Sequence, residues 1–121
     1  MSNRRSGRMP DEAVELVEER SNGMCEARCG RRATEIHHRR YLSRGGRHNV
    51  ANLVHLCGMG NHDNGFCHGV AHRGKQAPPG WSISAWDRRH ESEIPFEDLA
   101  GRLWWFDDEG NKTQGRRRND E

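Results

Sequence analysis

The sequence predicts a small α+β domain that needs additional stabilisation beyond its hydrophobic core. Short helical and strand-like segments are mixed along the chain, with no internal repeat. Only 31% of the 121 residues are hydrophobic, so the chain can bury little apolar surface. Small domains with such a core commonly depend on disulfides or a metal ion. The chain has 4 cysteines that could serve this purpose.

The first half of the expected domain is a helix followed by a strand and a further ordered segment. Residues 10–20 read as a helix, because a proline opens the segment, acidic residues fill its first turn and apolar residues recur along it. Asn22 begins the turn that ends it. Residues 33–39 read as a short strand and residues 43–46 as a loop, and ordered structure is expected to resume over residues 51–56.

The second half is expected to hold one more helix and a small β-rich part. Residues 68–73 read as a helix closed by a glycine. Residues 81–86 and 103–106 read as strands, and residues 108–111 as a hairpin turn. We expect the tryptophans of this half to form a small core rather than base-stacking platforms: Trp81, Trp86, Trp104 and Trp105.

The cysteines are expected to be reduced. Residues 1–5 lack the apolar stretch of a secretory signal, and the longest apolar run, residues 103–106, is far too short to span a membrane. These features predict a cytoplasmic protein with no membrane partner. Disulfides rarely persist in that compartment, so metal binding is the better interpretation of the cysteines.

The spacing of the cysteines favours a structural zinc site. Cys25 and Cys29 are separated by three residues in a glycine-bearing turn, a spacing that can place both thiolates on one ion. Cys57 and Cys67 are separated by nine residues, a looser pair. We expect all four to bind one zinc ion. His62 in place of one cysteine, and four unliganded thiols, are the alternatives.

A group of histidines favours a second, catalytic metal site. His68 and His72 are four residues apart, so on a helix their imidazoles share one face and can bind one ion. A third imidazole from the His37–His38 pair would leave coordination positions open for water and a phosphate oxygen. Scattered surface histidines are the simpler alternative.

These residues, taken in order, resemble the HNH, or ββα-metal, nucleases. The matching segments are residues 35–38, residues 52–53 and residues 67–72. The flanking cysteines are similar to those of the zinc-stapled, phage-type branch of that family. The resemblance implies a metal-dependent endonuclease that hydrolyses DNA, with Mg²⁺, Mn²⁺ or another divalent ion at the catalytic site.

The resemblance also implies a role for each residue. His38 takes the position of the general base that draws a proton from the attacking water. Asn52 takes the position of the asparagine that braces the loop carrying the base. The catalytic ion would be held by three residues: His37, His68 and His72. For Glu35, a counterpart of an acid in the bacteriocin branch and a plain salt bridge are equally open.

Arginines are concentrated beside the proposed site. Residues 28–47 hold seven arginines and one acid, whereas residues 83–109 hold eight acids and three arginines. A basic half beside an acidic half favours a polyanion partner on one face, although two solvated charged faces are the alternative. The expected DNA contacts are Arg39, Arg40, Arg44 and Arg47.

We expect the chain to divide into four parts. These are a mobile tail (1–9), a nuclease core with a zinc knuckle (10–75), a C-terminal extension (76–114) and a second tail (115–121). Two other functions stay open: a non-catalytic zinc module that binds nucleic acid or protein, and an accessory nuclease of a phage DNA-packaging machine, with a terminase as partner.

Overall fold

The structure is a computed structural model that describes residues 9–59 and 65–115. The expected tails therefore fall largely outside the described residues, as does His62. Gly115, placed in the second tail, is the last residue of a strand. The helices and strands are α1 (Asp11–Ser21), β1 (Glu35–His38), β2 (Leu53–Leu56), α2 (Cys67–Ala71), β3 (Phe96–Glu97), β4 (Leu103–Phe106) and β5 (Lys112–Gly115). The short 3₁₀ turns are η1 (Leu42–Arg44), η2 (Val50–Asn52), η3 (Gly74–Gln76) and η4 (Glu91–Glu93).

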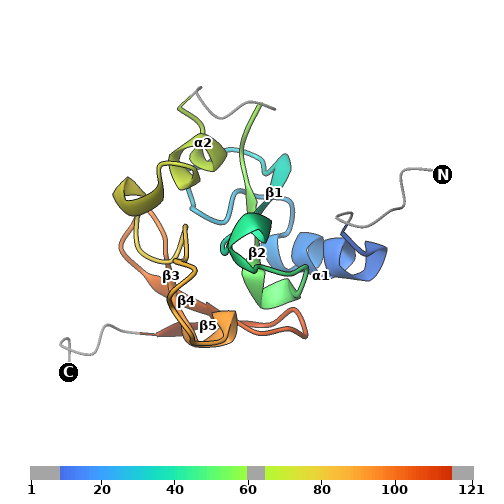
Figure 1. Ribbon diagram of the computed structural model, residues 1–121. Helices are drawn as coiled ribbons and strands as arrows, with labels where there is room; N and C mark the ends of the chain where they lie inside the picture. The colour runs from blue at the N-terminus through green and yellow to red at the C-terminus, as the bar shows by residue number, and fades with distance from the viewer. Residues whose placement is uncertain (1–8, 60–64, 116–121) are drawn as a thin grey trace.

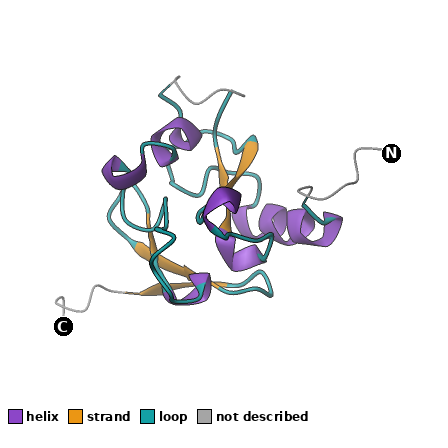
Figure 2. Ribbon diagram, viewed as in Figure 1, coloured by secondary structure: helices purple, strands orange, loops and turns teal. Residues whose placement is uncertain are grey.

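The elements form a mixed α+β fold, as predicted (Figure 1). β1 and β2 pair as an antiparallel hairpin, with α1 on one side and α2 beyond its end. The antiparallel sheet β3-β4-β5 lies at the opposite end of the molecule from α2. Figure 2 shows that loops make up much of the chain between these short elements.

Helix α1 is fastened to the rest of the domain by a buried ion pair. Arg20, in its last turn, donates to both carboxylate oxygens of Glu26 at 2.7 and 2.8 Å and to the carbonyl oxygen of Leu53 at 2.6 Å. Glu26 in turn accepts from the backbone N–H of His55. Because removal of one partner would leave a buried charge unpaired, this pair links α1 firmly to β2.

The C-terminal extension shares its core with the hairpin. Trp81 is fully buried and stacks on Phe96 with ring centroids 5.2 Å apart. The buried side chains of this core come from both parts of the chain: Cys25, Ala27, Ala51, Val54, Leu56, Cys57, Cys67, Ala71, Trp81, Phe96 and Phe106. A single core of this kind makes the extension part of the scaffold that positions β1.

The extension also corrects two predictions. Residues 81–86 form no strand, because their backbone groups bond elsewhere: the N–H of Ile83 donates to Arg39, and the carbonyl of Ser84 accepts from the Arg40 side chain. Trp86 is not a core residue, since it is 89% exposed. The strand at Leu103–Phe106 and the hairpin turn that follows it are confirmed.

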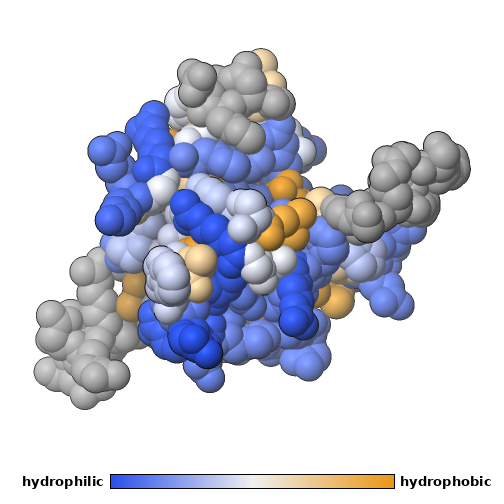
Figure 3. Space-filling model, viewed as in Figure 1, coloured by the Kyte–Doolittle hydropathy of each residue, from blue (hydrophilic) through white to orange (hydrophobic). Residues whose placement is uncertain are grey.

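The surface is predominantly polar. On the face shown in Figure 3, hydrophobic residues form only small, separate patches. No helix within the described part of the chain is long and apolar enough to cross a lipid bilayer.

Candidate active site

The two histidines of β1 point to different surroundings. Successive side chains of a strand alternate between its faces. His37 is 1% exposed, and its Nε2 lies 2.7 Å from the carbonyl oxygen of Trp81. Burial lowers the pKa of His37 to about 3, so its imidazole is neutral at pH 7. With Nε2 donating to that carbonyl, the Nδ1 lone pair is left available for a metal ion.

Three imidazoles meet at one point between β1 and α2. Nitrogen atoms of His37, His68 and His72 all lie within 4.8 Å of one another. The Nε2 atoms of His68 and His72 are 3.3 Å apart, close to the separation of about 3.4 Å for two nitrogens that bind one ion tetrahedrally. Although α2 ends at Ala71, the N–H of His72 still bonds to Gly69, so the expected four-residue spacing keeps both rings together.

Glu35 fixes the orientation of one of these rings. Its Oε1 lies 2.6 Å from Nδ1 of His68, which leaves His68 Nε2 turned toward the other imidazoles. A carboxylate behind a ligating histidine sets its tautomer and raises its basicity. Gly58 makes this contact possible, because a Cβ at that position would overlap the Glu35 carboxylate.

These imidazoles open into a pocket of about 350 Å³ that also contains His38. Burial and, to a smaller extent, the neighbouring His48 lower the pKa of His38 to about 4, so the ring is neutral at pH 7. A neutral imidazole beside a metal site can accept a proton from water. The pocket is lined by Ile36, His37, His38, Tyr41, Leu42, Ser43, His68 and His72.

His48 is a site residue that the sequence reasoning missed. Its Nδ1 lies 3.0 Å from Nε2 of His38, and the two ring centroids are 5.1 Å apart. The ten-residue separation matches no helix or strand period, so no local pattern pointed to it. The one available signal was that a third histidine follows His37 and His38, in the loop after β1.

Asn52 closes the loop that joins the two strands. The side chain is fully buried, its Oδ1 accepts from the N–H of Arg40, and its Nδ2 donates to the carbonyls of Arg40 and Arg47. A Cβ at Gly46 would overlap the Arg40 carbonyl, so glycine is needed where the loop returns. The loop that carries His48 is thereby held against the end of β1.

The four cysteines form a second cluster, where the end of β2 meets the start of α2. Their sulfur atoms lie within 4.8 Å of one another, and those of Cys29 and Cys57 are 3.6 Å apart. All four thiols are free of disulfides. This spacing is close to the roughly 3.8 Å expected of two thiolates on one tetrahedral zinc ion. The structure therefore unites the two pairs despite the long second spacing.

The ionisation of these thiols also favours a bound cation. A hydrogen bond from Cys67 lowers the pKa of Cys25 to about 5. The bond that stabilises the Cys25 thiolate raises the pKa of Cys67 itself, and burial raises the pKa of Cys29. The thiolate forms of Cys29 and Cys67 are therefore disfavoured unless a cation neutralises them.

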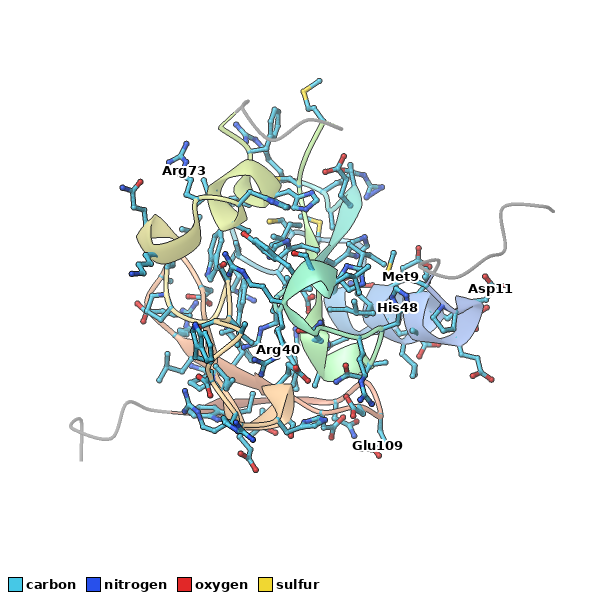
Figure 4. The ribbon with its side chains drawn as sticks, viewed as in Figure 1. Met9, Asp11, Arg40, His48, Arg73 and Glu109 are labelled. Atoms are coloured by element: carbon cyan, nitrogen blue, oxygen red, sulfur yellow. The ribbon has the colours of Figure 1, made fainter. Side chains whose placement is uncertain are left out.

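Arg39 and Arg40 are not available to DNA, which corrects their expected role. Arg39 is fully buried and donates to the carbonyl oxygens of Gly80, Ala51, Glu91 and Ile94. Arg40 is 7% exposed, and its Nε lies 2.7 Å from Glu91 Oε2. In Figure 4, Arg40 lies in the middle of the molecule, whereas Arg73 extends from its edge. Both buried arginines join the hairpin to the extension.

The other two arginines lie nearer to solvent. Arg47 is exposed. Arg44 is half-buried, and its guanidinium lies 4.3 Å from the ring centroid of Tyr41. Its Nη1–H donates a hydrogen bond to the hydroxyl of Ser82 at 3.3 Å. Of the four arginines expected at DNA, the structure therefore leaves these two nearer to solvent, and Arg44 contacts Tyr41 of the histidine pocket.

The hairpin, the helix and the imidazoles between them define a ββα-metal type of site. Residues 23–64 match the family model of the HNH endonucleases. The match ends before α2, and only the folded structure brings His68 and His72 to it. No curated protein and no solved structure matches the chain.

Proposed function

We propose that the protein is a metal-dependent endonuclease that hydrolyses DNA phosphodiester bonds. One observation carries the proposal: the facing imidazoles of His37, His68 and His72 share a pocket with a fourth, separately held imidazole, His38. A site that only stabilised the fold would not need an open pocket beside it, whereas hydrolysis needs a metal and a base on either side of one phosphate.

The donor set fits a divalent ion with open coordination positions. His37, His68 and His72 would hold Mg²⁺, Mn²⁺ or another divalent ion, and the outer nitrogens of His37 and His68 are held by Trp81 and Glu35. When bound, the ion supplies charge neutralisation for the scissile phosphate and for the departing oxygen.

His38 acts as the general base. We infer that its Nε2–H is donated to Nδ1 of His48, which leaves Nδ1 of His38 to accept the proton of the attacking water. His48 is thus a positioning residue that selects the tautomer of the base. Asn52 supports the arrangement, because it holds the loop that carries His48.

The four cysteines serve the fold. We propose that Cys25, Cys29, Cys57 and Cys67 hold a structural zinc ion. Reduced thiols suit a cytoplasmic protein. DNA is bound mainly through its phosphates, with Arg44 and Arg47 among the contacts, so affinity falls steeply as salt rises.

The test compares plasmid nicking by the wild-type protein and by His38→Ala. We expect the variant to cleave roughly 10²- to 10⁴-fold more slowly, while it binds DNA and divalent ion as the wild type does. Nicking should stop when the exchangeable ion is chelated and resume when it is restored. Cleavage by His38→Ala within a few-fold of wild type would remove His38 from the mechanism.

Two other functions give different results in the same assay. A non-catalytic zinc module would bind nucleic acid or protein without nicking under any divalent ion. An accessory nuclease of a phage packaging machine would nick only when its partner, such as a terminase, is added. The histidine pocket favours catalysis over the first of these, because the cysteines alone would satisfy a binding module.

A further inference from the structure

The side chain of Trp86 stands out from the rest of the surface. At 89% exposure it is the most exposed large hydrophobic side chain within residues 9–59 and 65–115. Its three fellow tryptophans are buried or half-buried. An indole that contributes nothing to the core but is fully presented to solvent favours a binding role.

The backbone that carries Trp86 is held in place by the buried Arg40. The Arg40 guanidinium donates to the carbonyl oxygens of Ser84, Asp87 and Arg89, each at 2.8 Å. The N–H of Trp86 itself donates to the hydroxyl of Ser84 at 3.0 Å. These bonds attach the loop to the interior on both sides of the indole. The charge of Arg40 is neutralised by Glu91.

Trp86 forms one wall of a groove with a positive lining. The groove has a volume of about 250 Å³ and includes Arg44, Lys75, Ser82 and Ser84. No acidic residue is among the described residues that line it. Lys75 is exposed on η3, a short distance along the chain from His72.

A continuous chain of contacts joins this groove to the histidine pocket. Arg44 lies over the ring of Tyr41, and Tyr41 stacks on His72 with ring centroids 5.1 Å apart at an angle of 20°. Arg44 also donates to Ser82 in the groove. Tyr41 and Arg44 therefore link the two openings. A strand cleaved in the pocket would pass the groove with its neighbouring nucleotides.

We propose that the groove binds an unpaired nucleotide of the DNA strand being cut, with its base stacked on Trp86 and its phosphates on Arg44 and Lys75. The bases in an intact duplex already stack on each other, so only an unpaired base can offer its face to the indole. The preferred substrate is then DNA with a single-stranded segment beside the scissile phosphate. This inference rests on the proposed nuclease function and specifies its substrate.

The lining argues for a nucleotide rather than a protein partner. Protein interfaces centre on several apolar side chains that are buried together. Here one aromatic ring is flanked by two cations and two hydroxyl groups. That combination matches the stacking surface and positive groove with which proteins hold single-stranded nucleic acid.

The test measures binding without cleavage, in a His38→Ala background. The probes are a single-stranded oligonucleotide and a blunt duplex of the same sequence. We expect Trp86→Ala to weaken binding of the single strand by roughly 5- to 150-fold, the range for losing one base–aromatic stack, and to leave duplex binding nearly unchanged. Trp86→Phe should retain most of the affinity, because it keeps an aromatic face.

Leu99→Ala is the matched control, since Leu99 is an exposed apolar residue outside both openings. It should bind both probes as the parent does. Equal single-strand affinity in Trp86→Ala and the parent would overturn the inference, as would equal losses on both probes. If the wild type fails to nick any DNA, the nuclease proposal fails, while the difference between the two probes still decides the role of Trp86.

Discussion

Nε2 of His38 lies 3.0 Å from Nδ1 of His48, so each imidazole occupies one nitrogen of the other. His38 comes from the end of β1 and His48 from the loop that Asn52 closes. A base whose second nitrogen is held by a neighbour keeps one tautomer and one ring orientation. Loss of His48 should therefore affect the reaction through His38.

We predict that His48→Ala lowers the single-turnover cleavage rate by roughly 10- to 100-fold, as expected of a misplaced catalytic group. His48→Gln should recover part of the rate, because its amide oxygen can accept the same hydrogen bond. DNA affinity should stay unchanged in both. His90→Ala, a half-exposed histidine outside the pocket, is the control. A normal rate in His48→Ala would show that His38 needs no such partner.

Glu35→Gln should weaken the exchangeable metal site by about 10- to 100-fold, the usual effect of losing an outer carboxylate. The reason is its 2.6 Å contact with Nδ1 of His68. Calorimetric titration with Mn²⁺ measures the affinity, and Glu15→Gln, an exposed position on α1, serves as the control. If Mn²⁺ binds the two variants equally, Glu35 does not orient a ligand.

Cys29→Ser should lose both the tightly held zinc ion and the fold. Zinc binding contributes on the order of 10 kcal/mol to the folding of small zinc modules, far more than this core can replace. Metal analysis of the wild type should find about one tightly bound zinc ion per chain, and circular dichroism should show Cys29→Ser unfolded. Wild-type protein that is folded but free of zinc would disprove this role.

Substitution of Arg39 should lower the stability of the fold, whereas substitution of Arg47 should alter only DNA binding. Arg39→Met leaves buried carbonyl oxygens without donors and should cost about 2–5 kcal/mol of unfolding free energy. Arg47→Ala should leave stability unchanged and reduce the slope of log affinity against log salt by about 1. Chemical denaturation and DNA titration at several salt concentrations measure the two. An unchanged salt slope would exclude Arg47 as a phosphate contact.

The ion pair between Arg40 and Glu91 should make stability depend on pH in the acid range. Burial alone would raise the pKa of Glu91, but hydrogen bonds from Arg40 and Asn49 outweigh it and lower the pKa below its usual 4.5. A lowered folded pKa contributes stability that is present above about pH 4.5 and is lost as pH falls through the folded value.

Glu91→Gln should accordingly be less stable than wild type at neutral pH, by an amount that stays constant down to about pH 5 and shrinks below it. Urea denaturation of both proteins across this range measures the difference. Because both proteins keep the cysteine cluster, acid release of a metal ion from it would affect them alike. A difference that does not change with pH would mean that the carboxylate charge plays no part.

Local spacing predicted the parts of the site that depend on one element at a time. The four-residue spacing brings the imidazoles of His68 and His72 together, and adjacent strand residues diverge as His37 and His38 do. The turn that carries Cys25 and Cys29 is also local. In these cases covalent geometry sets the relation between side chains, so the sequence alone is sufficient.

Other features depend on which segments meet, and the sequence carries no period that encodes them. Arg39 resembles an exposed DNA contact in the sequence, yet its donors are satisfied by carbonyls from residues up to 55 positions away. The same packing brings the Trp81 carbonyl to His37 and His48 to His38. Trp86 is left in solvent because Arg40 holds its loop on the surface. The sequence by itself therefore determined the residue types of the site and their short spacings. Tertiary packing decided which side chains are buried and which hydrogen-bond partners the site residues have. The reason is that desolvation and hydrogen bonding depend on every segment that surrounds a group.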